Sequence, residues 1–511
     1  MKKIPGIVVT GEALSVEEVT QVARDYESVT LDRDAREHVA RRRDIIDSKA
    51  ADPQPHYGVS TGFGALATTY ISVDRRRQLQ LSLIRSHAAG TGREVDTEVV
   101  RALMLLRLRT LMSGYTGVRP EVCDMYAAML NHRITPVVYE FGSLGCSGDL
   151  APLAHVALVA IGDGEARIEG GPIMPGAEAL ATAGLTPLEL QEKEGLALIN
   201  GTDGMLGCLA LAIHDVTSLL VTADAAAAMS VESLMATDRV FQEDVQRLRP
   251  HPGQLESARR MARVLRGSPL VASHKGSEDG RVQDAYSLRC SPQVHGAARA
   301  TLTHATQVAD VELASAIDNP VLTDEGLLQS NGNFHGAPLA YVLDFLAIVL
   351  ADVASISERR TDRFLDVSRN QGLPPFLAHE VGVDSGLMIA QYTAAAIVSD
   401  LKRLAQPASV DSIPSSALQE DHVSMGWHSA MKLRSAIDGL GRVLAIELLT
   451  ASWGQSLRAP LMPGPITGAI AQKVIEVAGP VGQDKFLAPV IEGVYRLVRE
   501  RKITEIVEGM V

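Results

Sequence analysis

Apolar residues recur at helical spacing along most of the chain, and their pattern predicts two kinds of helix. In the N-terminal part, short breaks with Gly, Pro or Asp separate modest helices predicted at residues 35–50, 75–90, 96–112 and 119–131. Farther along, longer segments rich in Ala, Leu and Val predict buried helices of several turns at residues 204–234, 294–317, 338–364, 386–404 and 427–455. The pattern therefore predicts a mainly α fold that ends in a bundle of long helices.

The stretches between these helices are where loops are expected. Between about 140 and 200 the sequence is rich in Gly and Pro, which predicts loops and short strands. The connections between the long helices, around 266–292, 319–336, 366–384 and 406–424, are longer than a compact bundle needs. We expect the catalytic and binding residues to lie on these loops. We expect two domains: an N-terminal helical domain with a loop-rich active-site region, 1–202, and a long-helix bundle, 203–511.

Composition and charge narrow the class of protein. Hydrophobic residues make up 46% of the 511 residues but aromatic residues only 4%, which favours helices over a β-sandwich or barrel. The formal net charge of -13 argues against nucleic acid and anionic membranes as partners, because such binding depends on Lys and Arg. Charged residues such as Asp344 and Asp352 interrupt the most apolar stretches, so we expect buried helices there rather than membrane spans.

The cysteines and the N-terminus indicate an intracellular protein. The four cysteines lie far apart without a C-x-x-C pair, which favours a reducing compartment and neither a disulfide framework nor a zinc site. The first residues lack the apolar run of a signal peptide, so we expect the cytoplasm. No acidic cluster carries histidines at ligand spacing, so no metal is expected. So many apolar helices favour a homo-oligomer that buries some of their faces.

The most informative stretch is 142–155, Gly-Ser-Leu-Gly-Cys-Ser-Gly-Asp-Leu-Ala-Pro-Leu-Ala-His. A hydrolase nucleophile would read Gly-x-Ser-x-Gly, but here Gly148 directly follows Ser147, and Asp149 stands where the second glycine belongs. The order x-Ser-Gly instead suits a backbone cyclisation. The nitrogen of Gly148, unhindered by a Cβ, attacks the carbonyl carbon of Cys146, and loss of two waters leaves a ring with an exocyclic methylidene from Ser147.

With this triplet the chain resembles the aromatic amino acid ammonia-lyases, which use a 4-methylideneimidazole-5-one group as their electrophile. The resemblance runs from Tyr-Gly-Val-Ser-Thr-Gly-Phe-Gly at 57–64 to Gln-Glu-Asp-His-Val-Ser-Met at 419–425. It implies a fumarase/aspartase-like helical plan, although no loop resembles the Gly-Ser-Ser-x-Met-Pro signature of those enzymes. The family usually has Ala at the position of Cys146, whose side chain stays outside the ring. No external cofactor is implied.

The resemblance also implies roles for residues far from the triplet. Tyr57 would be the base that removes the β-proton, and Arg289 would clamp the substrate carboxylate, to which a planar guanidinium is suited. Tyr286 and Gln283 would line the same pocket, with Tyr286 holding or protonating groups near the electrophile. The alternatives are a structural loop residue for Tyr57 and a surface or structural residue for Arg289 and Gln283. Gly62-Phe63-Gly64 lacks the third glycine and the preceding strand of a dinucleotide-binding loop.

Three further residues match pocket positions of the family. Asn200 would orient the ring and the substrate amine, Phe334 would form an aromatic wall, and Met388 would line the pocket. The alternatives are a helix cap for Asn200, an ordinary core residue for Phe334 and helical core packing for Met388.

Two positions favour histidine as the substrate. His87, in Arg-Ser-His-Ala-Ala-Gly at 85–90, resembles the histidine-specific version of the family's selectivity pair, and it could exchange hydrogen bonds with an imidazole. Glu420 stands where phenylalanine and tyrosine enzymes usually have Gln, and a carboxylate suits a protonatable imidazole better than a phenyl ring.

We therefore expect conversion of L-histidine to trans-urocanate and ammonia by a tetramer in which neighbouring chains complete each active site. Alternatives are a tyrosine or phenylalanine ammonia-lyase, an aromatic amino acid aminomutase using the same electrophile, and an inactive helical relative.

Overall fold

The computed structural model describes residues 6–52, 54–56, 58–62, 69–275 and 282–510, and it confirms the mainly α fold. The described residues form two compact units, each built from three segments of the chain. Unit 1 comprises residues 1–214, 305–344 and 407–431, and unit 2 comprises 215–304, 345–406 and 432–511. The boundary expected between residues 202 and 203 falls at the first residue of the long helix α9 (Asp203–Ser233).

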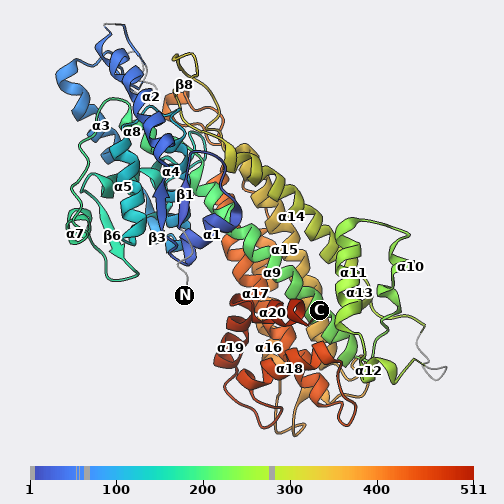
Figure 1. The fold of residues 1–511 in the computed structure, drawn as a ribbon. Coiled ribbons are helices and arrows are strands. Elements are labelled where there is room, and N and C mark those ends of the chain that lie inside the picture. The colour runs from blue at the N-terminus through green and yellow to red at the C-terminus, as the bar shows by residue number, and fades with distance from the viewer. Residues whose placement is uncertain (1–5, 53, 57, 63–68, 276–281, 511) are drawn as a thin grey trace. The chain divides into compact units, whose positions relative to one another are not determined.

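Unit 1 is a set of short and medium helices around α4, with small sheets between them (Figure 1). Its helices are α1 (Val16–Arg24), α2 (Arg33–Ala51), α3 (Val73–His87), α4 (Thr97–Met112), α5 (Pro120–Asn131), α6 (Leu150–Ala160), α7 (Gly176–Thr182) and α8 (Glu194–Ile199). Strands β1 (Ile7–Val9) and β2 (Val29–Leu31) pair in parallel, with Ile7 opposite Val29.

The other strand pairs of unit 1 are antiparallel. They are β3 (Thr91–Glu94) with β5 (Tyr139–Phe141), β4 (Ile134–Pro136) with β6 (Glu165–Ile168), β6 with β7 (Met174–Pro175), and β8 (Val321–Leu322) with β9 (Leu328–Gln329).

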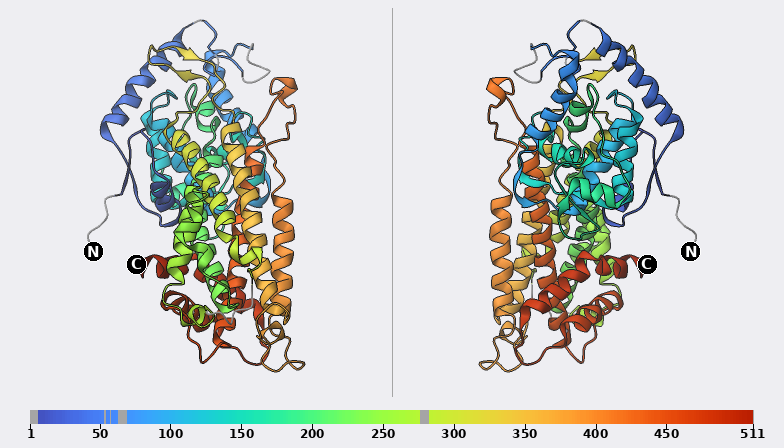
Figure 2. Two further views of the ribbon diagram at one scale, coloured as in Figure 1. Left: turned by 90° about the vertical axis from the view of Figure 1, so that its right-hand side faces the viewer. Right: turned by 90° about the vertical axis from the view of Figure 1, so that its left-hand side faces the viewer.

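Long helices make up most of unit 2 and lie side by side in Figures 1 and 2. They are α16 (Met388–Leu404) and the larger parts of α9, α14 (Ser291–Ala314), α15 (Ala337–Leu365) and α17 (Gly426–Ser456), whose remaining residues belong to unit 1. Shorter helices flank them: α10 (Glu243–Gln246), α11 (Pro252–Val264), α12 (Pro269–Ala272), α13 (Tyr286–Arg289), α18 (Pro465–Ala478), α19 (Leu487–Arg499) and α20 (Lys502–Gly509). Among the described residues, short 3-10 turns lie at Arg239–Phe241 and Pro375–Leu377 in unit 2, and at Ser416–Leu418 in unit 1.

Two of the long helices, α9 and α15, are long and apolar enough to span a membrane by length and composition alone. Their most apolar windows are 83% and 61% buried inside the protein, respectively. Most of each window therefore lies in the protein interior.

Helix α4 is the centre of unit 1, because every residue from Val99 to Met112 is buried. Its arginines use their guanidinium groups to hold loop carbonyls in the interior. Arg101 donates to the carbonyls of Val22 and Leu130, and Arg107 donates to that of Asn200 at 2.9 Å. A buried guanidinium needs such acceptors, since an unpaired buried donor is costly.

The structure also shows helices where only loops and short strands were predicted. Helices α6, α7 and α8 lie within residues 140–200. The sequence of α6, Leu-Ala-Pro-Leu-Ala-His-Val-Ala-Leu-Val-Ala, is apolar on every face, so it has no helical periodicity to detect. Pro152 is tolerated because it lies in the first turn, where no helical hydrogen bond is lost.

Candidate active site

The Cys-Ser-Gly triplet lies in unit 1, in the loop immediately before α6. Gly148 has φ +75 and pairs in parallel with Gly201 in an isolated bridge. A Cβ on Gly148 would overlap the carbonyl oxygen of Gly201, which accepts a hydrogen bond from the N–H of Asp149 at 2.7 Å. Only glycine fits this position, in both backbone angle and space.

Segments from distant parts of unit 1 hold the preceding residues of the loop. The carbonyl of Leu144 accepts from the N–H of Met425 at 2.8 Å. The carbonyl of Gly145 accepts from the hydroxyl of Ser424 at 2.7 Å and from the N–H of Gly336 at 3.2 Å. The loop is thus bonded to the residues directly before α15 and α17.

Asp149 connects the loop to a third helix. Its carboxylate is fully buried and accepts from the N–H groups of Gly204 and Met205 in the first turn of α9, each at 2.9 Å. The hydroxyl of Ser143 lies 3.3 Å from both the Asp149 carboxylate and the Gly148 carbonyl. Burial raises the pKa of Asp149 to about 7, although the two N–H groups oppose this shift.

Four helices therefore begin at or beside the loop: α6, α9, α15 and α17. The N-terminus of an α-helix carries a partial positive charge from its unpaired N–H groups. Their convergence brings partial positive charge to this loop, although burial outweighs it at the Asp149 carboxyl.

Glu420 faces the triplet directly. Its carboxylate accepts from the Cys146 thiol at 3.1 Å, from the Ser147 hydroxyl at 3.2 Å and from the Ser415 hydroxyl at 2.9 Å. Burial is the main cause that raises the pKa of Cys146 to about 12, with the charge of Glu420 acting in the same direction. The thiol therefore stays protonated and serves as a donor to Glu420.

His87, the last residue of α3, is influenced by the same carboxylate. Its Nδ1 donates to the carbonyl of Leu83 at 2.9 Å, and the side chain is half-buried. Burial lowers the pKa of His87, while the charge of Glu420 acts against that shift. The structure thus brings together Cys146, Ser147, Gly148 and Glu420, and the charge of Glu420 also acts on His87.

Asn200 ends helix α8 one residue before Gly201, the partner of Gly148. Its Nδ2 donates to the carbonyl of Asn319 at 3.1 Å. Its buried Oδ1 has no hydrogen-bond partner among the described residues. Phe334 is half-buried in the turn between β9 and α15, two residues before Gly336. Both residues lie in unit 1.

The remaining expected residues lie in unit 2 or outside the described residues. Arg289 is half-buried in α13, its Nε donates to the Asp284 carbonyl at 2.8 Å, and its guanidinium lies 4.7 Å from the ring centre of Tyr286. Tyr286 is 71% exposed, and Gln283 is also exposed. Met388 is the partly buried first residue of α16. Tyr57 lies outside the described residues.

The structure adds residues that the sequence interpretation missed. Ser143 and Ser424 hold the triplet loop, and Ser415 holds Glu420. An Asp directly before an apolar run is a helix-start signal, which could have indicated the position of Asp149 at α6. Nothing in the sequence distinguishes Ser415 from its neighbouring serine. Among the residues described, no group of three His, Cys, Asp or Glu could hold a metal ion.

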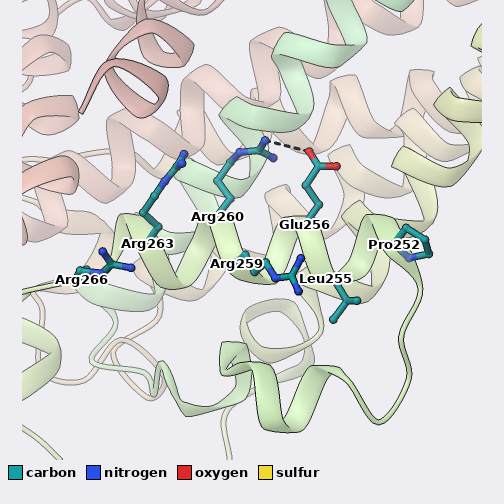
Figure 3. A pocket seen from close by; sticks show the side chains of 7 residues that line it. All are labelled: Pro252, Leu255, Glu256, Arg259, Arg260, Arg263 and Arg266. Atoms are coloured by element: carbon teal, nitrogen blue, oxygen red, sulfur yellow. Dashed lines mark hydrogen bonds and ion pairs between the residues drawn. The ribbon is translucent and has the colours of Figure 1, made fainter. Parts of the chain in front are cut away.

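A separate cavity of about 700 Å³ lies along α11 in unit 2 (Figure 3). It is lined by Pro252, Leu255, Glu256, Arg259, Arg260, Arg263 and Arg266. Arg260 donates to Glu256 at 3.0 Å and to Asp224 at 2.9 Å, and Arg259 donates to Glu243 at 2.8 Å. None of the expected site residues lines this cavity.

Comparison with known proteins gives matches over almost the whole chain. The family described as "Aromatic amino acid lyase" matches residues 14–476. A histidine ammonia-lyase of Streptomyces griseus is 56% identical over 506 residues, covering 98% of each chain. One of Gloeobacter violaceus is 46% identical over 505 residues, again covering 98% of each.

Solved structures show the same fold. A tyrosine aminomutase from Streptomyces globisporus matches with a TM-score of 0.93 and 34% identity, covering 99% of this chain and 98% of that one. A histidine ammonia-lyase from Trypanosoma cruzi matches with a TM-score of 0.90 and 35% identity, covering 99% and 95%.

Proposed function

The chain belongs to the aromatic amino acid lyase family, and we propose that it is a histidine ammonia-lyase that converts L-histidine to trans-urocanate and ammonia. The observation that carries the choice of substrate is the placement of Glu420. Its carboxylate contacts Cys146 and Ser147, and its negative charge opposes the lowering of the His87 pKa. A carboxylate beside the triplet suits a polar, protonatable substrate ring. Full-length relatives named histidine ammonia-lyase support the same choice.

The residues around the triplet fit a 4-methylideneimidazole-5-one group made from Cys146, Ser147 and Gly148. Gly148 occupies a space that would exclude a Cβ, and the buried Oδ1 of Asn200 is an acceptor left without a donor in the uncyclised chain. Such a group supplies an electrophilic carbon–carbon double bond, which side chains do not offer.

The side chains would then divide the remaining tasks. Arg289 would bind the substrate carboxylate, and His87 and Glu420 would orient its imidazole. Tyr57 would take the β-proton, a weakly acidic hydrogen that needs a positioned base. Tyr286, Gln283, Asn200, Phe334 and Met388 would line the pocket.

We further propose a cytoplasmic homotetramer in which neighbouring chains complete each site. The exposed aromatic ring of Tyr286 supports this arrangement, as do exposed apolar side chains on α15 and α16, namely Phe345, Ile348, Ile389 and Tyr392. Apolar side chains gathered on a surface are typical of interfaces. Light scattering should give four times the subunit mass, and a monomer would contradict the proposal.

Two measurements test the function. The intact-protein mass should be lower than the encoded mass by two water molecules, and Ser147→Ala should show the full substituted mass and almost no activity. Purified protein should form urocanate from L-histidine faster than cinnamate or coumarate from phenylalanine or tyrosine. Turnover of tyrosine alone would reject histidine as the substrate, and a β-amino acid product would indicate an aminomutase, the activity named for the S. globisporus relative.

A further inference from the structure

Helix α13 of unit 2 is too short to hold its own shape. It has four residues, Tyr286–Arg289, and it carries both Tyr286 and the proposed carboxylate clamp Arg289. One helical turn fixes several dihedral angles for very few hydrogen bonds, and its last carbonyls have no partner within the helix. The position of Arg289 must therefore depend on contacts from outside α13.

One such contact comes from a buried arginine of the helix bundle. The carbonyl of Ser287, inside α13, accepts from Nη1 of Arg360 at 3.3 Å and from the hydroxyl of Ser291 at 3.1 Å. Nη1 of Arg360 also donates to the Ser291 hydroxyl at 3.2 Å. A single nitrogen on α15 thus holds α13 and the first residue of α14 together.

The guanidinium is itself held by Glu447 on α17. Nε and Nη2 of Arg360 donate to the two carboxylate oxygens at 2.5 and 2.8 Å, and both side chains are fully buried. The hydroxyls of Ser230 and Ser357 donate to the same carboxylate at 2.6 and 2.5 Å. The carboxylate accepts four hydrogen bonds and the guanidinium donates four, so the pair is fixed in one orientation.

We propose that Arg360 is a positioning residue that sets the location of Arg289 through the Ser287 carbonyl, with Glu447 fixing its orientation. This inference rests on the proposed role of Arg289 as the carboxylate clamp. The planar shape of the Arg360 guanidinium is essential to this role. Three of its N–H donors point in fixed directions, toward the two carboxylate oxygens of Glu447 and the backbone oxygen of Ser287. A lysine keeps the charge but cannot bond both Glu447 and the Ser287 carbonyl with the same geometry.

The test compares two competitive ligands that differ in one group. Imidazolepropionate carries a carboxylate for Arg289, whereas 4-methylimidazole does not. In Arg360→Lys, we expect the dissociation constant of imidazolepropionate, measured by calorimetry, to rise about tenfold or more, because small misplacements of a positioning group are costly. That of 4-methylimidazole should change less than about twofold. A larger rise in the dissociation constant of imidazolepropionate than in that of 4-methylimidazole distinguishes a positioning role from a general loss of structure.

Arg299→Lys is the matched control. Arg299 is another buried arginine of unit 2, bonded to Asp224 at 2.6 Å and to Ser257 at 2.9 Å. We expect this variant to affect both ligands equally. If Arg360→Lys does not fold, Ser291→Ala removes only the hydroxyl that shares the Ser287 carbonyl and should give a smaller shift of the same kind.

Equal effects on both ligands, or none, in a folded Arg360→Lys protein would overturn the inference. Arg289→Lys tells this outcome apart from failure of the proposed function. Arg289→Lys should weaken imidazolepropionate alone, and if it does not, the clamp role itself is wrong.

Discussion

Replacing Asp149 with Asn should change how the stability of the protein depends on pH. The carboxyl is fully buried at the start of α6, and its pKa rises from the ordinary 3.8 to about 7. Because the folded protein holds this proton more tightly than the unfolded chain does, the group favours folding at low pH. That contribution is lost as the pH rises through 7.

The size of the loss follows from the shift. About three pH units at about 1.4 kcal/mol each give about 4 kcal/mol in total, of which about 3 kcal/mol falls between pH 5 and pH 8. Asn keeps the shape and cannot ionise. Its oxygen can accept from Gly204 and Met205, and its amide can donate to Ser143.

Urea unfolding followed by tryptophan fluorescence, at equal protein concentrations, measures the effect. From pH 5 to pH 8, the unfolding free energy of Asp149→Asn should rise relative to wild type by about 3 kcal/mol. Asp74→Asn, on the exposed first turn of α3, is the control and should track wild type. A relative change below about 1 kcal/mol would refute the argument that an ionisable, buried Asp149 costs stability at neutral pH.

Three further substitutions test the proposed site. Gly148→Ala should lose the mass deficit of two waters and melt at a lower temperature, because its Cβ overlaps the Gly201 carbonyl; a normal deficit would contradict the strict need for glycine. Cys146→Ala should keep the deficit, while the lost bond to Glu420 lowers kcat/KM for histidine about two- to tenfold; unchanged kinetics would show that the thiol has no role in the reaction. Glu420→Gln should lower histidine turnover about 100-fold with little change in melting temperature, and equal losses of both would indicate a structural role.

Length and apolar composition were enough to predict the long helices. The segment predicted at 427–455 is α17 at Gly426–Ser456, and that predicted at 338–364 is α15 at Ala337–Leu365. These segments are long and rich in Ala, Leu and Val, which together indicate buried helices. Helix α6 was missed because it is apolar on every side, and Pro152 reads locally as a break although it is harmless in a first turn.

The candidate site, like the fold, could be predicted from the sequence only in part. The triplet could be predicted from the order of its residues, and Glu420 only from the family resemblance; the structure places the Glu420 carboxylate 3.2 Å from the Ser147 hydroxyl. The contacts that hold them could not be predicted, since Ser415 and Ser424 act through three-dimensional proximity to a carboxylate and to a backbone carbonyl. A serine that bonds a carbonyl 279 residues away leaves no local pattern in the sequence.

That long separation fixes when the chemistry can begin in a newly made chain. The carbonyl of Gly145 is bonded by Ser424, and that of Leu144 by Met425, so the loop reaches its held shape only after translation has passed these positions. On the proposed function, a nascent chain halted earlier carries an inert Cys-Ser-Gly sequence. The ring, once closed, is covalent and survives later denaturation. A denatured sample that contains the ring must therefore have been folded earlier.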